Sequence, residues 1–225
     1  MSQALDDLKG DLRDLFVGER TVGDSFPAPI AFVATNAFVG IGAAAVVAVV
    51  VGALVAAWRI RKGQQVVYAL GGIAAIAFAA FLALRSGRAE SYFLPGIVGA
   101  VLAGAAATIS VVVGKPLAAY SSWFLRRWPM EWYFRDDVRP AYTVVTVVWA
   151  GYFFARGAIQ LLLFNRGQPE LLAVAKLSTS WPLIVPIVIG TYLWGNHKLH
   201  TLGGPNVDEF TAAESPPFVG GQRGF

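Results

Sequence analysis

Long apolar stretches with few or no charges alternate with short charged segments along most of the chain. Besides a first stretch that begins near residue 26, four stretches have the length and apolar character of membrane-spanning helices. They cover residues 66–84, 93–113, 141–164 and 172–195, each bounded by a charge, a glycine or a proline. This pattern predicts an all-α integral membrane helical bundle.

The first stretch is too long for one straight crossing. From Phe26 to Trp58 it holds 33 residues without a formal charge, whereas about 20 helical residues cross the bilayer core. Prolines open it and a glycine interrupts it, so we expect a short half-crossing over 26–37 and a full helix over 38–58. The predicted bundle therefore has about five full transmembrane helices plus a short N-terminal element.

The two ends of the chain differ from the apolar part. Within residues 1–25, leucines recur at helical spacing opposite acidic side chains, which predicts an amphipathic interfacial helix and a linker. Residues 196–225 are polar, rich in glycine and proline, and lack periodicity, so we expect a disordered tail. The expected organisation is this helix, a transmembrane bundle over 26–195, and the tail.

Composition supports a membrane protein and excludes several kinds of chemistry. Hydrophobic residues make up 56% of the chain and charged residues 14%, against about 25% charged residues in soluble domains. The absence of cysteine excludes disulfides and thiolate metal sites. We attribute the net charge of +4 to membrane topology and expect no nucleic-acid partner.

Basic residues fall mainly in alternate loops, which sets the expected orientation. The loops after 38–58 and 93–113, together with the tail, hold ten lysines and arginines, while the two opposing loops hold three. We therefore expect the C-terminus in the cytoplasm. For the N-terminus both sides stay open, because the first short element either returns to its own side or crosses.

Some of these bases are expected to contact lipid headgroups. The candidates are Arg59, Arg61, Lys62, Lys115, Arg126 and Arg127. Apolar and aromatic positions from Leu117 to Leu125 precede the last two, which predicts an amphipathic interfacial segment between 114 and 140. Aromatic residues near span ends predict an interfacial belt: Trp58, Tyr92, Trp123, Trp128, Trp132, Tyr133, Tyr192 and Trp194.

Two cations lie inside predicted spans, where a charge is costly and indicates a function. Arg156 shares a helix face with Gln160, and Lys176 is about one turn into the last span. With Arg85 and Glu90 on the same outer side, they predict an outward-facing basic pocket for an anion, a lipid headgroup or a transported solute. The alternative is structural: the cations snorkel to the interface or pair with a glutamate such as Glu90.

One stripe of small residues predicts close helix packing, within the chain or between identical chains. It comprises Gly96, Gly99, Ala100, Ala103, Gly104 and Ala107.

Catalytic motifs are lacking in the sequence. His197 and His200 form a pair just past the last span, but a third metal ligand is not evident. We find no nucleotide-binding loop, nucleophile elbow or metalloprotease motif. We therefore expect no enzymatic activity, no cofactor and no metal site.

The stretch RSGRAESYFLPGI over 85–97 resembles the most characteristic segment of the domain of unknown function 3159 family, small bacterial and archaeal membrane proteins. The resemblance extends over about 26–194. A more distant similarity to the intracellular septation protein A family rests on short motifs at 58–62 and 114–117 and on Lys176. The first resemblance implies a family without an established activity. The second implies a role in envelope synthesis and cell division.

Together these observations favour a non-enzymatic protein of the prokaryotic cytoplasmic membrane, an accessory or partner-binding subunit of a membrane or cell-envelope assembly. Its expected partners are membrane lipids and proteins that contact the termini, and a homo-oligomer is left open. The alternative is a small transporter or channel that uses the outward-facing pocket around Arg156 and Lys176.

Overall fold

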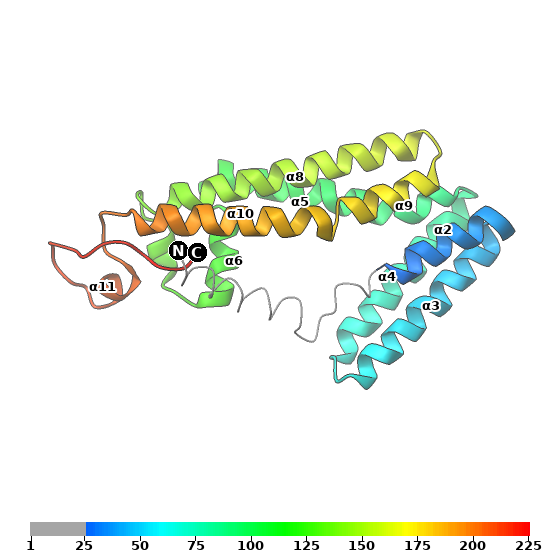
Figure 1. Ribbon diagram of the computed structural model, residues 1–225, viewed down its shortest axis with the longest axis horizontal. Coiled ribbons are helices and arrows are strands. Elements are labelled where there is room, and N and C mark those ends of the chain that lie inside the picture. Colours follow the sequence, from blue (N-terminus) through cyan, green and yellow to red (C-terminus); the bar gives the residue numbers. More distant parts are fainter. Residues whose placement is uncertain (1–25) are drawn as a thin grey trace. The chain divides into compact units, whose positions relative to one another are not determined.

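The computed structural model describes residues 26–225, which fold into helices and connecting turns (Figure 1). Among these residues, five helical segments are long and apolar enough to cross a membrane: Ile41–Arg61, Val66–Ser86, Ala89–Val112, Arg139–Asn165 and Pro169–His200. The predicted all-α membrane fold is thereby confirmed. The amphipathic helix predicted within residues 1–25 lies outside the described residues.

The described chain divides into two compact units. The first contains residues 26–99 and 156–183, and the second contains residues 100–155 and 184–225. Three helices contribute residues to both units: α5 (Leu94–Val112), α8 (Arg139–Asn165) and α10 (Trp181–His200).

In the first unit, α2 (Pro27–Val39), α3 (Ile41–Arg61) and α4 (Val66–Ser86) lie side by side (Figure 1). The 13 residues of α2 span about 20 Å, less than the bilayer core of about 30 Å. The predicted short element is therefore present. The chain reverses between α2 and α3 at Gly40, whose φ of 100° is open to glycine but strained for other residues.

Alanines bring the helices of the first unit close together. Phe32 of α2 is fully buried and stacks on Tyr92 of the short helix η2 (Ala89–Phe93), with 4.1 Å between ring centroids. Helix α9 (Pro169–Ser178) packs against both α2 and η2. The alanines around these rings are Ala44, Ala45, Ala48, Ala79, Ala80 and Ala83. Small side chains let helices approach closely, which is how membrane helices gain packing energy in lipid.

The last predicted span is interrupted. Its helix ends with α9 and resumes as α10, so the break precedes Pro182. The hydroxyls of Thr179 and Ser180 donate hydrogen bonds to the carbonyls four residues earlier. The carbonyl of Ala175 also accepts the backbone N–H of Thr179, whereas the backbone N–H of Ser180 bonds to Leu177. The Ser180 hydroxyl therefore satisfies the carbonyl of Lys176, as a membrane interior requires.

The second unit has an aromatic core in which short helices pack against the start of α8 and the end of α10. It contains the short helices α6 (Leu117–Arg126) and α7 (Met130–Tyr133), so the amphipathic segment predicted after residue 114 is helical. Trp132 and Tyr133 of α7 are fully buried beside Tyr142 of α8. The predicted interfacial belt is thus wrong for Trp132 and Tyr133, and also for Tyr92 in the first unit, because all three are buried in the protein.

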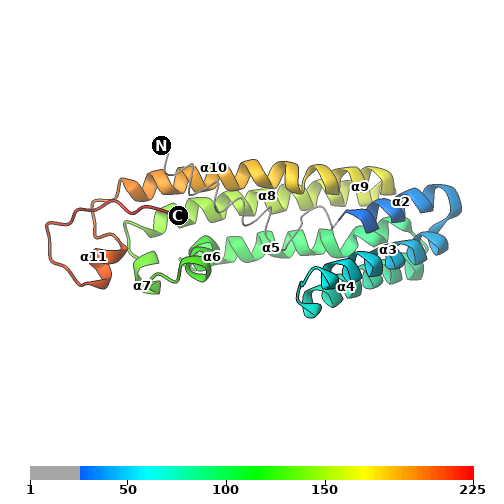
Figure 2. The ribbon, with the colours of Figure 1, turned by 60° about the horizontal axis from the view of Figure 1, so that its bottom comes forward.

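The tail is folded, and the prediction of disorder is wrong. Residues 207–211 form α11 (Val207–Thr211), and the chain then returns towards α10 (Figures 1 and 2). Phe225 at its end packs against the aromatic core of the second unit, with its ring 4.5 Å from that of Tyr142.

Candidate functional sites

The predicted outer polar cluster lies in the first unit, where α4, η2 and α9 meet. Arg85 is exposed in the last turn of α4, whereas Glu90 in η2 is 9% exposed. The carboxylate of Glu90 lies 3.7 Å from Arg88, whose guanidinium also donates to the carbonyl of Phe164 at 3.3 Å. Glu90 thus forms an ion pair with Arg88, which precedes it by two residues in the sequence.

The turn between α8 and α9 closes over Glu90. Gly167 has a φ of +67°, and a side chain there would place its Cβ 3.0 Å from a carboxylate oxygen of Glu90. A glycine therefore meets two needs at this position, the left-handed backbone and the close approach of the carboxylate.

The two intramembrane cations lie near each other in the first unit. Lys176 of α9 is half-buried, with its ammonium 5.8 Å from the ring centroid of Phe93. Arg156 of α8 is close enough for the two positive charges to repel. One turn further along α8, Gln160 is 3% exposed, and its amide nitrogen has no hydrogen-bond partner in the described part of the chain. The structure thus places two cations and an amide donor in this unit.

Three of the six predicted basic contacts lie beside aromatic rings. Arg59 and Arg61 occupy the last turn of α3, and the ammonium of Lys62 lies 4.3 Å from the ring centroid of Trp58. In the second unit, Lys115 precedes α6. Arg126 and Arg127 end that helix, with their guanidinium carbons 5.2 and 5.0 Å from the ring centroids of Trp128 and Trp123 respectively. Cations over indole rings suit a membrane interface.

A capping box organises the tail. The Asn206 side chain accepts a hydrogen bond from the backbone N–H of Glu209, and the Glu209 carboxylate accepts one from the backbone N–H of Asn206, both at 2.9 Å. Glu209 also accepts from the N–H of Val219 at 2.6 Å. The bond from Asn206 contributes most to holding the pKa of Glu209 below its ordinary value of 4.5. The Asn-x-x-Glu spacing is the sequence signal that predicts this turn of helix.

Further bonds fasten the tail to its own unit. The indole N–H of Trp132 donates to the carbonyl of Pro205 at 3.2 Å, and Arg135 donates to the same carbonyl. Arg126 donates to the backbone oxygen of Phe225 at 3.1 Å. A glycine just before Phe225 donates to the side chain of Asn196 at 2.7 Å. These anchors lie far from the tail in the sequence, and no local sequence pattern marks them as its partners.

The surface of the folded tail contains a polar hollow of about 530 Å³. His200, Asp208, Val219 and Arg223 are among the residues that line it, and all four are exposed. Opposite charges and an exposed apolar side chain are thus held together on an ordered surface.

The five long apolar helices and the short α2 define a multi-pass membrane protein. Over residues 16–201 the chain matches the family model described as protein of unknown function (DUF3159), and it belongs to this family. The match includes the five described spans and ends one residue after the last of them. No curated protein and no solved structure matches the chain. The more distant similarity to the septation protein A family stays a prediction.

Proposed function

We propose that this protein is a non-enzymatic, partner-binding subunit of an assembly in the prokaryotic cytoplasmic membrane or cell envelope. The observation that carries the proposal is the ordered surface of the tail. Folding a polar segment costs roughly 1–2 kcal/mol of backbone entropy per residue, and here hydrogen bonds and aromatic packing offset that cost. A surface ordered in this way is ready to dock another chain.

The chemistry of the hollow suits a protein partner. Asp208 and Arg223 carry opposite charges, and Val219 is 93% exposed. A complementary surface would pair with both charges and cover the valine. Charge complementarity of this kind sets specificity and association rate.

The expected side of this contact is the cytoplasm. Ten bases against three in the opposing loops favour a cytoplasmic C-terminus, which supports placing the tail there. A partner would then be a cytoplasmic protein or the cytoplasmic part of another membrane protein. The proposal requires no cofactor.

The test reverses charges in the hollow without touching the anchors of the tail. Asp208→Lys and Arg223→Glu change two lining residues, whereas Glu214→Lys changes an exposed acid of the tail that does not line the hollow. The protein is extracted from native membranes in mild detergent, and the chains that copurify are quantified by mass spectrometry. We expect the hollow variants to lose partners that the wild type and Glu214→Lys retain. A wild type that runs alone, or partners that survive both reversals, would contradict the proposal.

Deletion of residues 201–225 is a poorer test. It would remove Phe225 from Tyr142 and Pro205 from Trp132, so the aromatic core would lose packing along with the hollow. Loss of a partner after that deletion would not separate binding from folding.

A second candidate function is a small transporter or channel for an anion. The observation that favours it is the grouping of Lys176 and Arg156 with the unsatisfied amide of Gln160. Two like charges at membrane depth are costly, and a bound anion would offset that cost.

Its test is anion flux in liposomes. Lys176→Gln and Arg156→Gln remove the two cations, and Arg166→Gln is the control because this exposed arginine lies in the loop between α8 and α9. We expect chloride or phosphate flux to fall in the first two variants and to persist in the control. Flux that is unchanged in all three, or absent from the wild type, would exclude this function.

A further inference from the structure

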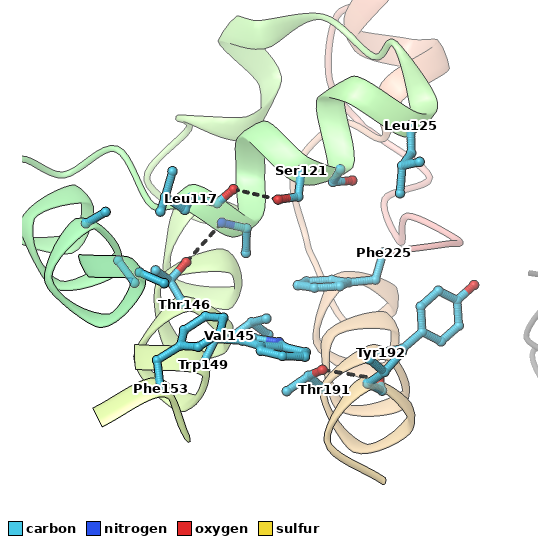
Figure 3. Close-up of a pocket in the computed structure, with 16 residues that line it drawn as sticks. Leu117, Ser121, Leu125, Val145, Thr146, Trp149, Phe153, Thr191, Tyr192 and Phe225 are labelled. Carbon is cyan, nitrogen blue, oxygen red and sulfur yellow. Dashed lines mark hydrogen bonds between the residues drawn. The ribbon is translucent and has the colours of Figure 1, made fainter. Parts of the chain in front are cut away.

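A largely apolar cavity of about 490 Å³ lies within the second unit (Figure 3). Its walls come from α5, α6, α8 and α10, and Phe225 of the tail closes part of it. Leu117 and Leu125 on α6 line it and are 40% and 79% exposed, so the cavity reaches the protein surface. Its volume falls in the range of about 300–1,000 Å³ that is usual for ligand pockets.

The position of α6 creates the cavity. This helix begins without a capping side chain of its own. Instead, Ser110 of α5 accepts a hydrogen bond from the N–H of Leu117 at 3.1 Å, and Thr146 of α8 accepts one from Ala118 at 3.1 Å. These bonds tie the start of α6 to two spans. Beneath it, alanines of α5 leave space opposite Trp149 and Phe153 of α8.

The hydroxyl groups of the walls are already bonded within the protein. Thr146 donates to the carbonyl of Tyr142 at 2.8 Å, and Thr191 donates to that of Ile187 at 2.7 Å. Ser121 likewise donates to a carbonyl of its own helix at 3.2 Å. With these donors engaged, the walls offer an occupant chiefly apolar surface, which suits a hydrocarbon chain better than a polar solute.

A cation stands at one edge of the cavity. Arg126 follows the lining residue Leu125 and donates to two further lining residues, to the hydroxyl of Tyr192 at 3.5 Å and to the backbone oxygen of Phe225 at 3.1 Å. Figure 3 shows the Phe225 ring between Leu125 of α6 and Tyr192 of α10. A guanidinium at the edge of an apolar cavity matches an amphiphile with an anionic head.

We infer that this cavity binds one acyl chain of an anionic phospholipid, with the lipid phosphate at Arg126. The apolar walls select the chain, and the arginine selects the charge of the headgroup. A phospholipid is favoured over a soluble amphiphile because three of the helices that form the walls, α5, α8 and α10, belong to membrane spans, where lipid is the solvent. The inference is independent of the partner-binding proposal, which concerns the polar hollow on the surface of the tail.

The test uses delipidated protein in non-ionic detergent, titrated with phosphatidylglycerol or phosphatidylcholine that carry the same brominated acyl chains. Bromine quenches the fluorescence of Trp149 when a chain enters the cavity, and Trp149→Phe identifies that component. We expect saturable quenching, with phosphatidylglycerol bound about fivefold more tightly, the effect of one arginine at a lipid headgroup. Quenching that does not saturate, or equal affinity for both lipids, would overturn the inference.

Filling the cavity supplies a matched pair of variants. Ala106 is an exposed lining residue of α5, and Ala105 lies on the opposite face of the same helix and does not line the cavity. Ala106→Phe should weaken binding of both lipids at least about tenfold, because several methylene groups lose their burial. Ala105→Phe should bind as the wild type does. Equal binding by Ala106→Phe and the wild type would show bulk lipid contact only.

The arginine is tested in the same assay. Arg126→Gln should lose the preference for phosphatidylglycerol while still binding phosphatidylcholine, which shows that the cavity remains folded. Arg126→Lys and the neighbouring Arg127→Gln should keep the preference. An equal loss in Arg127→Gln would indicate general surface charge, and inhibition by inorganic phosphate alone would indicate a phosphate site. Native mass spectrometry should show a bound lipid, whereas a lipid-free dimer would mean that a second copy covers the cavity. An equal loss in Arg127→Gln, inhibition by phosphate alone or a lipid-free dimer would each overturn the inference.

Discussion

The docking of the tail predicts that one methyl group on α10 destabilises the second unit. A Cβ at Gly195 would lie 2.3 Å from the nearest ring carbon of Phe225. Because carbon atoms in contact are about 3.5–4.0 Å apart, the ring would have to retreat by about 1.2–1.7 Å. Tyr142 stacks on the ring with 4.5 Å between centroids, and Arg126 holds the backbone oxygen of Phe225, so this retreat disturbs both contacts.

The cost follows from overpacking. Forcing a methyl group into a filled site costs about 1–3 kcal/mol, whereas alanine in place of glycine favours the helix by about 1 kcal/mol. Gly190 separates the two effects, because it lies in the same helix and no atom of residues 26–225 comes within 4 Å of an added Cβ. We expect Gly195→Ala to be less stable than Gly190→Ala by about 1–3 kcal/mol.

The assay is unfolding by sodium dodecyl sulfate in mixed micelles, followed by tryptophan fluorescence. A double-mutant cycle identifies the cause. In a Phe225→Ala background the added methyl group meets no ring, so Gly195→Ala should cost no more there than Gly190→Ala does. An equal cost of Gly195→Ala with and without the Phe225 ring would refute the claimed contact.

Two further predictions concern the same tail. The chain lacks cysteine, so single cysteines can report the orientation of the protein in the membrane. In intact cells, Val219→Cys should resist a membrane-impermeant maleimide until the cells are permeabilised, whereas Arg166→Cys should react at once. The reverse pattern would contradict the proposed cytoplasmic side of the tail. The second prediction concerns Glu209, whose pKa is lowered mainly by the hydrogen bond from Asn206. The ionised carboxylate therefore stabilises the tail above pH 4.5, and this contribution is lost as the pH falls through the lowered pKa. Acid titration from about pH 6 to 3 should change the emission of Trp132, with a smaller acid-dependent change in Glu209→Gln.

The spans could be predicted from the sequence because the bilayer imposes a simple rule. Backbone polar groups must be satisfied within each segment, so every long uncharged run becomes a helix. The turn that separates α2 from α3 was predictable from Gly40, which interrupts an uncharged run too long for one crossing. The break between α9 and α10 was only partly predictable. Pro182 marks its region, but its position also depends on the Ser180 hydroxyl, which satisfies the carbonyl of Lys176.

The fold of the tail was not predictable from composition. Glycine and proline lower the average tendency to order, but the order here comes from a few specific contacts. Phe225 stacks on Tyr142, and Pro205 accepts from Trp132, although each pair is separated by more than 70 positions in the sequence. Trp132 was wrongly expected at the lipid interface, because its burial depends on Pro205 and the tail, which lie far along the chain. Only the capping box at Asn206 left a local signal.

The candidate sites differ in the same way. Arg156 and Lys176 stand out in the sequence because a charge contrasts with an apolar run, and this contrast is independent of how the helices pack. The cavity gives no such contrast, since Ala106 and Trp149 are ordinary residues for a span and become a site only when α6 is fixed over them. Sequence reasoning about membrane proteins is therefore biased towards sites for charged ligands. Sites for lipid chains emerge from the packing, and in this protein from the bonds that hold one short helix to two spans.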